Sequence, residues 1–261
     1  MSDTPRYNVP GLERGLRILQ LFDRSRKVIS AAEMARALDI PRSTAFRIAQ
    51  TLEHLGFLVR ENDAYRVGPA VLRMGFEYIA SLEFTELARP LVEKLRDETG
   101  YSAQLVIRDG RDVVVVLKAA AQTTFGSNVN VGTRLPAHAT ILGRILLADT
   151  DDRALAALYP GASLPKASAK SPHSLAELKR LLREDRARGY AVSESFFEQG
   201  VSAVAAPVRD GTGEIVAAIS ITAQRPTLEP AELRERLIKQ VLRAARELSH
   251  QLNYRPAEAA A

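Results

Sequence analysis

The sequence contains no cysteine among its 261 residues. This absence excludes disulfide bonds, thiolate zinc sites and a cysteine nucleophile. Long apolar runs are also missing, since the most apolar stretch, residues 113–121, is interrupted by Lys118 and is far shorter than the ~20 residues that span a bilayer. Residues 1–10 are polar. We therefore expect a soluble, cytoplasmic protein that is not exported.

Catalytic motifs are absent as well. The four histidines, His54, His138, His173 and His250, do not have metal-ligand spacing, and there is no Gly-x-Ser-x-Gly elbow, phosphate-binding glycine loop or nucleotide fingerprint. A lone histidine such as His138 is more often a packed, hydrogen-bonded residue than a base. We expect no enzyme activity, no metal and no cofactor.

The composition is 46% apolar and 26% charged, which is ordinary for a globular protein and sufficient for two hydrophobic cores. The net charge of +5 is spread over the chain, because residues 1–80 contain 12 Lys and Arg against 9 Asp and Glu. Net charge alone therefore does not indicate nucleic-acid binding. The placement of the arginines must be considered instead.

Residues 30–68 have the pattern of a winged helix-turn-helix. Ser30 and Glu33 form a capping box at the start of a short helix, and Pro41 favours the start of a second helix after a tight turn. In that second helix an apolar stripe predicts the face toward the core: Ala45, Ile48, Ala49, Leu52 and Leu55. The sequence thus predicts two helices that meet at a corner.

The opposite side of the second helix carries side chains suited to a DNA major groove. Arginine reads guanine or holds phosphate, hydroxyls accept or donate, and an apolar ring contacts a thymine methyl group. Gly56 ends the helix, and residues 57–60 and 65–67 form a hairpin around the turn at residues 61–63. The predicted DNA-binding residues are Arg42, Ser43, Thr44, Phe46 and Arg47 on the helix, with Arg60 and Arg66 on the wing. A small helical bundle with solvated arginines is the alternative.

Two further apolar stripes flank this motif. Leu12, Leu16, Leu19 and Phe22, with Ile18 beside them, predict a preceding helix that completes the small core. After Gly68 and Pro69, a linker helix carries a second stripe: Val71, Leu72, Gly75, Phe76, Ile79 and Leu82. This stripe packs either against another subunit or against the second domain of its own chain.

From residue 85 the pattern changes to strands grouped between helices. Helices are expected at residues 85–98, 139–148, 151–158, 175–188 and 231–252, and strands at 103–107, 113–117, 190–192, 203–208 and 215–222. A second capping box is expected from Ser174 to Glu177. The fold class is α+β: a winged helix-turn-helix over residues 1–68, a linker helix over 69–84, and over 85–254 an antiparallel-sheet domain open to a small ligand on one face.

Two places in the second domain are candidates for ligand binding. Ser220 and Thr222 share one face of an otherwise apolar strand; they either contact a ligand or bond to neighbouring protein groups. Residues 132–143 form a Gly/Pro loop that leads into a helix. If Thr140 caps that helix, the amides of Ile141 and Leu142 are free for a carboxylate.

At several of these motifs the sequence resembles the IclR family of bacterial transcriptional regulators. The resemblance rests on residues 12–16, 41–47, 132–140, 142–144, 189–190 and 200–208. It implies a GAF-like effector domain, binding of small organic acids, and dimers that often pair into tetramers. Carried over by position, the effector pocket falls on Leu135, Ile141, Leu142, Ser193, Val201, Ala203, Ser220 and Thr222. Residues 128–136 are most similar to the branch that regulates protocatechuate, 4-hydroxybenzoate and β-ketoadipate catabolism.

The sequence thus indicates a sequence-specific DNA-binding regulator. We expect it to bind a near-palindromic double-stranded operator as a homodimer or homotetramer, with an affinity modulated by a small organic acid, aromatic acids included. The alternative is an architectural DNA-binding protein whose second domain serves oligomerisation alone. Ligand-induced stabilisation separates the two hypotheses.

Overall fold

The computed structural model describes residues 7–23, 25–82, 84–121, 129–161 and 163–255. The chain divides into two compact units, residues 1–81 and 82–261, and each is described by itself. Asn128, part of the stretch that indicates the catabolic branch, and residues 1–6 of the polar N-terminal stretch lie outside the described residues.

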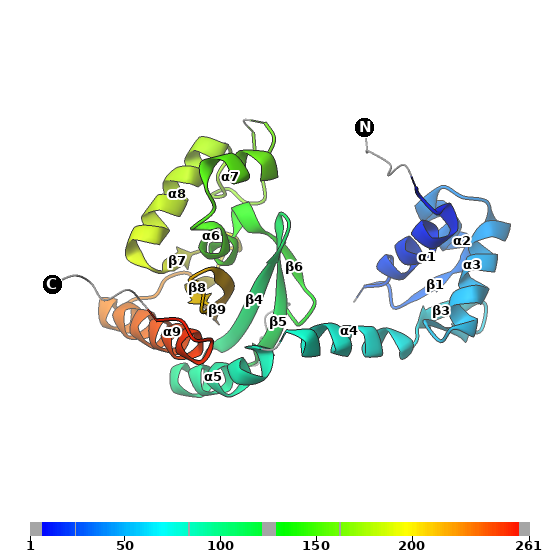
Figure 1. Ribbon diagram of the computed structural model, residues 1–261. Helices are drawn as coiled ribbons and strands as arrows, with labels where there is room; N and C mark the ends of the chain where they lie inside the picture. The colour runs from blue at the N-terminus through cyan, green and yellow to red at the C-terminus, as the bar shows by residue number, and fades with distance from the viewer. Residues whose placement is uncertain (1–6, 24, 83, 122–128, 162, 256–261) are drawn as a thin grey trace. The chain divides into compact units, whose positions relative to one another are not determined.

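The first unit is a winged helix-turn-helix (Figure 1). Three helices precede the wing: α1 (Pro10–Gln20), α2 (Ala31–Leu38) and α3 (Arg42–His54). The wing consists of β2 (Leu58–Glu61) and β3 (Ala64–Val67), and α4 (Ala70–Ser81) follows it. β1 (Val28–Ser30), which was not predicted from the sequence, pairs with β3, so the antiparallel sheet has the order β1-β3-β2.

The local signals at the corner between α2 and α3 are confirmed. Ser30 accepts a hydrogen bond from the Glu33 amide, and the Glu33 carboxylate accepts one from the Ser30 amide, so the capping box is complete. Asp39 adopts the left-handed conformation (φ 52°) that turns the chain, and Pro41 is the N-cap of α3. Gly56 has the expected positive φ of 78° after the helix.

The predicted core face of the first helix is partly wrong: Ile18, Leu19 and Phe22 belong to the core or pack against it, but Leu12 and Leu16 do not. Leu12 and Leu16 are 63% and 51% exposed, whereas Gly15 and Ile18 are buried. A Cβ atom at Gly15 would lie at an ordinary contact distance of 3.7 Å from the Ile48 side chain, so the glycine side of α1 faces α3. Leu55 is also exposed, because it follows α3 as its C-cap and no longer continues the helical stripe.

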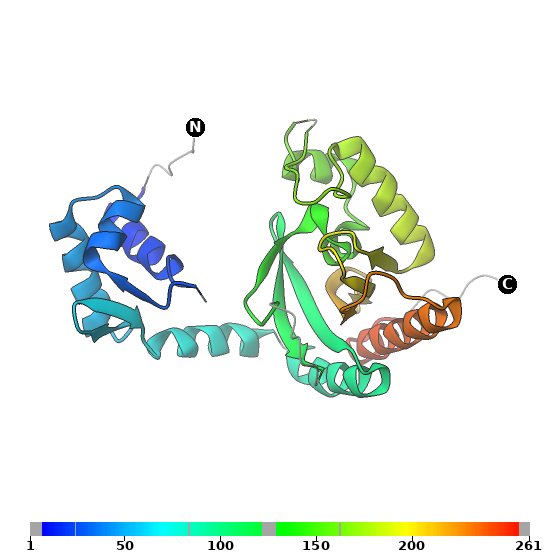
Figure 2. The same cartoon turned by 180° about the vertical axis from the view of Figure 1, so that it is seen from behind.

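The second unit is a six-stranded antiparallel sheet between two layers of helices (Figures 1 and 2). Its strands are β4 (Ser102–Asp109), β5 (Asp112–Ala119), β6 (Arg134–Pro136), β7 (Ala191–Glu194), β8 (Ser202–Arg209) and β9 (Ile215–Ala223), in the order β6-β5-β4-β9-β8-β7. The predicted strands are confirmed, four of them with somewhat wider bounds, while β7 starts one residue later than predicted and ends two residues later. β6 was predicted as part of a loop, and its three residues are too few for a periodic pattern.

Each face of this sheet has its own core. α5 (Phe84–Thr99) and α9 (Ala231–Gln251) cover one face, where Leu105, Ile219 and Leu237 are buried. α6 (Ile141–Leu147), α7 (Asp152–Leu158) and α8 (Leu175–Arg188) belong to the other core, which includes Val106 and Ala218. The face expected to be open to a ligand is thus covered by helices, and a ligand there would lie between helix and sheet.

The second capping box is incomplete. Ser174 accepts from the Glu177 amide at 3.2 Å, as expected, but the Glu177 carboxylate accepts from the amide of His173 at 3.0 Å instead of that of Ser174.

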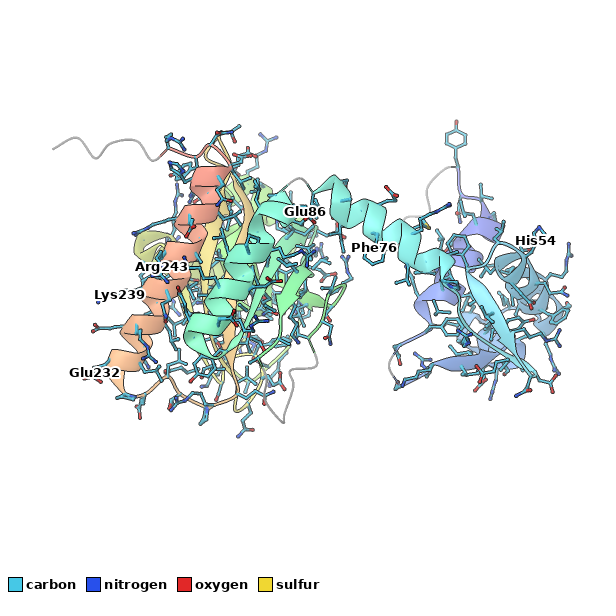
Figure 3. All side chains as sticks on the ribbon, turned by 90° about the horizontal axis from the view of Figure 1, so that it is seen from below. His54, Phe76, Glu86, Glu232, Lys239 and Arg243 are labelled. Carbon is cyan, nitrogen blue, oxygen red and sulfur yellow. The ribbon has the colours of Figure 1, made fainter. Side chains whose placement is uncertain are left out.

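On the outer face of α9, Glu232, Lys239 and Arg243 point to solvent (Figure 3), and Arg243 also pairs with Glu98 of α5. In the part of the chain that the structure describes, no helix is both long and apolar enough to cross a membrane.

Candidate nucleic-acid interface and ligand site

The outer side of α3 presents the predicted set of side chains to solvent. Arg42, Ser43 and Arg47 are exposed, Phe46 is 38% exposed and Thr44 is half-buried. The guanidinium groups of Arg42 and Arg47 form no hydrogen bond or ion pair with the described residues. Exposed, unpaired guanidinium groups on the second helix of a helix-turn-helix are placed to meet phosphate or base edges.

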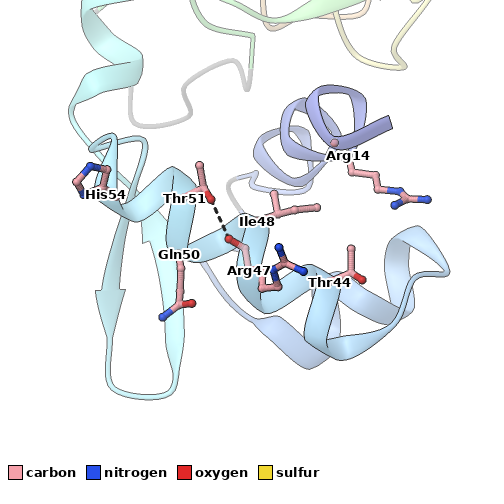
Figure 4. A pocket seen from close by; sticks show the side chains of 8 residues that line it. Arg14, Thr44, Arg47, Ile48, Gln50, Thr51 and His54 are labelled. Atoms are coloured by element: carbon pink, nitrogen blue, oxygen red, sulfur yellow. Dashed lines mark hydrogen bonds between the residues drawn. The ribbon is translucent and has the colours of Figure 1, made fainter. Parts of the chain in front are cut away.

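A hollow of about 740 Å³ lies between α1 and α3 (Figure 4). Arg14 of α1 and Arg47 of α3 both line it, together with Gly11, Thr44, Ile48, Gln50, Thr51 and His54. The sequence pattern places Arg14 off the apolar stripe of the first helix and assigns no contact to it. Its position at the same hollow as Arg47 adds a third cation to this side of the unit.

The two wing arginines are placed differently. Arg60 donates from Nε to the Asn62 carbonyl at 3.0 Å, and the Arg66 Nε lies 3.6 Å from a Glu61 carboxylate oxygen. The register pairs Arg60 with Tyr65 and Arg66 with Val59, so the two arginines occupy opposite faces of the hairpin. Both arginines are exposed. Because they lie on opposite faces of the hairpin, a DNA backbone can contact both of them only at the edge of the wing.

The predicted effector residues of the sheet meet on its α6 side. Ser220 and Thr222 of β9 share this face, as predicted, and the register joins Thr222 to Ala203 of β8, which in turn pairs with Ser193 of β7. Val201 lies just before β8. The Ser220 side chain is 0% exposed, and its hydroxyl has no hydrogen-bond partner in the described protein.

Gln104 of β4 lies beside these residues of the candidate site, although no motif in the sequence indicates it. It is the register partner of Ser220, and its side chain is 6% exposed. Its amide Nε2 donates to Thr222 Oγ1 at 3.3 Å. The signal in the sequence is a single glutamine among the apolar residues 103–107, but this segment alone does not show that Gln104 faces Ser220.

The start of α6 has the geometry expected from the loop sequence. Thr140 is the N-cap, and its hydroxyl accepts from the Gly143 amide at 3.1 Å. The first amide that bonds back to the Thr140 carbonyl is that of Arg144, so the amides of Ile141 and Leu142 precede the helical ladder. Gly143 is required here, because a Cβ atom would lie 2.1 Å from the Ala137 carbonyl oxygen.

The remaining predicted wall residues surround this point. Ile141 and Leu142 are buried in the core on the α6 side of the sheet, and Leu135 of β6 packs partly buried against that core. His138 is buried, its Nε2 lies 2.8 Å from the Pro165 carbonyl oxygen, and its ring meets Tyr159 edge-on at 5.8 Å. It is therefore a packed, hydrogen-bonded histidine. Among the described residues, no cluster of three His, Asp or Glu could hold a metal ion.

Comparisons with known proteins identify the family to which both units are similar. Residues 76–250 match the family described as bacterial transcriptional regulator IclR C-terminal, and residues 11–62 match the IclR helix-turn-helix domain. The Pca regulon regulatory protein of Pseudomonas putida is 30% identical over 242 residues, which are 92% of this chain and 83% of that protein.

Solved structures show the same architecture. A transcriptional regulator from Rhodococcus sp. RHA1 has a TM-score of 0.82 and 32% identity, covering 94% of this chain and 98% of its own. An IclR homologue from Microbacterium hydrocarbonoxydans, solved with 4-hydroxybenzoate, has a TM-score of 0.80 and 23% identity over 93% and 98%. A helix-turn-helix joined to this sheet domain, with both family models matched, shows that the chain belongs to the IclR family of DNA-binding bacterial transcriptional regulators.

Proposed function

We propose that this chain binds a near-palindromic operator, and that a small organic acid bound in the second unit changes its affinity for that operator. The observation that carries the ligand part is the Ser220 hydroxyl, which is fully buried and has no partner in the described protein. A buried polar group without a partner is rare in native proteins, so a ligand atom is a reasonable partner for it.

The proposed DNA contacts are those of α3 and the wing. Arg42 and Arg47 contact bases or phosphate, Ser43, Thr44 and Phe46 complete the surface of the recognition helix, and Arg60 and Arg66 contact the backbone. Exposure and the absence of competing partners support the helix residues most strongly.

The proposed effector site combines apolar wall and polar contacts. The Ile141 and Leu142 amides receive a carboxylate, and Ser193, Ser220 and Thr222 bind the remaining polar groups. Leu135, Val201 and Ala203 supply apolar surface without requiring polar partners.

The ligand class that fits this wall is an aromatic acid or its ring-cleavage product. Two relatives support this choice: one regulates the Pca regulon, and another was solved with 4-hydroxybenzoate. We further propose a cytoplasmic homodimer or homotetramer without enzyme activity, metal or cofactor, organised as a DNA-binding domain (1–68), linker helix (69–84) and effector domain (85–254).

The test replaces Ser220 by Ala and Thr222 by Val in one variant. Calorimetry with 4-hydroxybenzoate and other aromatic acids should show affinity reduced several-fold, while operator binding without effector stays nearly unchanged, since the substitutions lie outside the DNA-binding unit. Unchanged effector affinity would remove both hydroxyls from the site. An operator affinity indifferent to every bound acid would favour the architectural alternative, because a ligand regulates only through its different affinities for two states.

A further inference from the structure

A row of polar side chains crosses the apolar face of the sheet beneath α6. Gln104 of β4 is the register partner of Lys118 on β5 and of Ser220 on β9, so the three side chains lie on one face. Thr222 follows two residues after Ser220 on the same face. The neighbouring residues of this face, Val106, Ala205 and Ala218, are apolar and buried.

The direction of the Gln104 hydrogen bond determines what Thr222 can do. The Gln104 amide nitrogen is a donor, and it donates to Thr222 Oγ1 at 3.3 Å. A threonine hydroxyl has one proton and two lone pairs. Since Thr222 accepts from Gln104, its own proton stays available for a different acceptor. Beside it, the buried Ser220 hydroxyl has no hydrogen-bond partner in the described protein.

Lys118 adds a positive charge at the other end of the row. The Lys118 ammonium group donates to the carbonyl of Val129, and Val129 packs against the core on the α6 side. The cation is therefore held on the face that carries Ser220 and Thr222, where it favours an anion.

We infer that Gln104 is a positioning residue that determines effector specificity: it fixes Thr222 as a donor, so the end of the effector that meets the sheet is an anionic hydrogen-bond acceptor, a carboxylate. This inference rests on the proposed function and adds to it the residue that determines which chemical group of the effector binds at the sheet. It concerns the sheet end of the site and does not depend on the α6 amides.

The test uses pairs of acids that differ at one end. Hexanoate and hexanedioate, and 4-methylbenzoate and benzene-1,4-dicarboxylate, keep their shape while a methyl group becomes a carboxylate. In calorimetry with the full-length protein, the diacid of at least one pair should bind about 10-fold more tightly, since charge-assisted hydrogen bonds replace an apolar contact over buried donors.

Gln104→Glu reverses the hydrogen bond. An ionised glutamate can only accept, so the Thr222 proton turns toward it, and its negative charge repels a carboxylate. The diacid preference should fall below about 3-fold. Affinity for 4-hydroxybenzoate relative to 4-methylbenzoate should rise, because Thr222 then accepts from the phenol hydroxyl. Gln251→Glu, the same change at an exposed position on α9, should retain the wild-type preference.

A second variant covers the case in which Gln104→Glu does not fold. Gln104→Met keeps the length of the side chain and removes both amide atoms, so it should lower the diacid preference without creating one for the phenol. A diacid preference unchanged in either variant would overturn the role of Gln104 and leave the proposed function intact. Failure of every acid to bind the wild-type protein would overturn the proposed function and this inference with it.

Discussion

At the scale of single residues, the arginines of the first unit differ in whether they are already paired. Arg42 and Arg47 have no partner among the described residues, whereas Arg17 pairs with Glu13 at 2.6 Å. Replacing Arg42 and Arg47 together by Ala should weaken operator binding. A lost base contact costs ~1–3 kcal/mol and relaxes sequence preference, and a lost phosphate contact lowers the salt slope by about one unit.

Fluorescence anisotropy at several salt concentrations measures both effects on operator and unrelated DNA. Arg17→Ala, which removes an arginine already engaged by Glu13, is the matched control and should change binding much less. Operator affinity equal to that of the parent at every salt concentration would remove α3 from the interface.

The second prediction at the residue scale concerns a buried ion pair. Arg144 of α6 and Asp185 of α8 form a two-bond fork, at 2.7 and 3.0 Å, and their side chains are almost fully buried. Burial raises the pKa of Asp185, and the Arg144 hydrogen bonds oppose that rise. Arg144→Met should cost ~3–5 kcal/mol of stability, because it leaves Asp185 buried without its cation.

Chemical denaturation measures this cost, with two comparison variants. Adding Asp185→Leu to Arg144→Met should recover part of the loss, since no uncompensated charge remains. Lys179→Met, which breaks the surface pair with the exposed Asp152, should cost less than about 1 kcal/mol. Equal losses of stability in Arg144→Met and Lys179→Met would contradict the explanation that the cost comes from leaving the buried Asp185 charge without its cation.

Part of the candidate effector site could be predicted from the sequence, and part could not. Ser220 and Thr222 are two residues apart in one strand, so local periodicity alone places them on one face. Gln104 joins them through the pairing of β4 with β9, segments more than 100 positions apart in the sequence. No local pattern specifies that register, and a lone glutamine in a strand has several other uses.

At the scale of elements, local sequence signals predicted helix caps and turns correctly. They did not predict helix orientation or strand pairing, which depend on contacts between distant segments. The Ser30 capping box and the Gly56 turn depend on a few adjacent residues, and both were predicted correctly. The orientation of α1 depends instead on its packing against α3, which buries Gly15 and Ile18 and leaves Leu12 and Leu16 exposed. β1 was missed because its partner, β3, lies beyond two helices.

The connection between the end of β7 and the start of α9 gives a pH-dependent prediction. Glu194 accepts from the Leu228 amide at 2.8 Å and pairs with Arg234, and these contacts lower the pKa of its carboxyl group below the usual 4.5. The stabilisation is therefore fully present above pH about 4.5 and is lost as the pH falls through the lower pKa of the folded protein.

Glu194→Gln keeps the shape of the side chain and removes its charge. The variant should unfold at lower denaturant concentration than the parent at pH 7, and the difference should shrink as the pH falls from about 4.5 through the lower pKa of the folded protein, below which Glu194 is protonated in both states. Glu232→Gln, at an exposed position near the start of α9, is the control and should show a smaller difference. A difference that is constant from pH 7 into the acid range would exclude the charge as its source.

At the scale of the whole molecule, regulation requires the ligand to distinguish two states of the protein. Tight effector binding by itself does not change operator affinity. The effector shifts the operator affinity only as far as its binding free energy differs between the state that binds DNA and the state that does not. Operator binding must therefore change the effector affinity by the same factor. Calorimetry of the effector with and without bound operator should show that reciprocal change.

The last prediction concerns assembly through α4. None of its residues is buried, and Leu72 and Phe76, which lie one turn apart on one face, are each more than half exposed. Figure 3 shows the Phe76 side chain pointing away from the helix. Such an apolar stripe fits an interface between subunits, and two-fold DNA-binding proteins match palindromic sites. Leu72→Glu with Phe76→Glu should shift the mass in light scattering toward the monomer and reduce the footprint to one half-site. Glu77→Gln on the same helix should do neither. A monomeric parent at micromolar concentration, with a single half-site footprint, would rule out this mode of assembly.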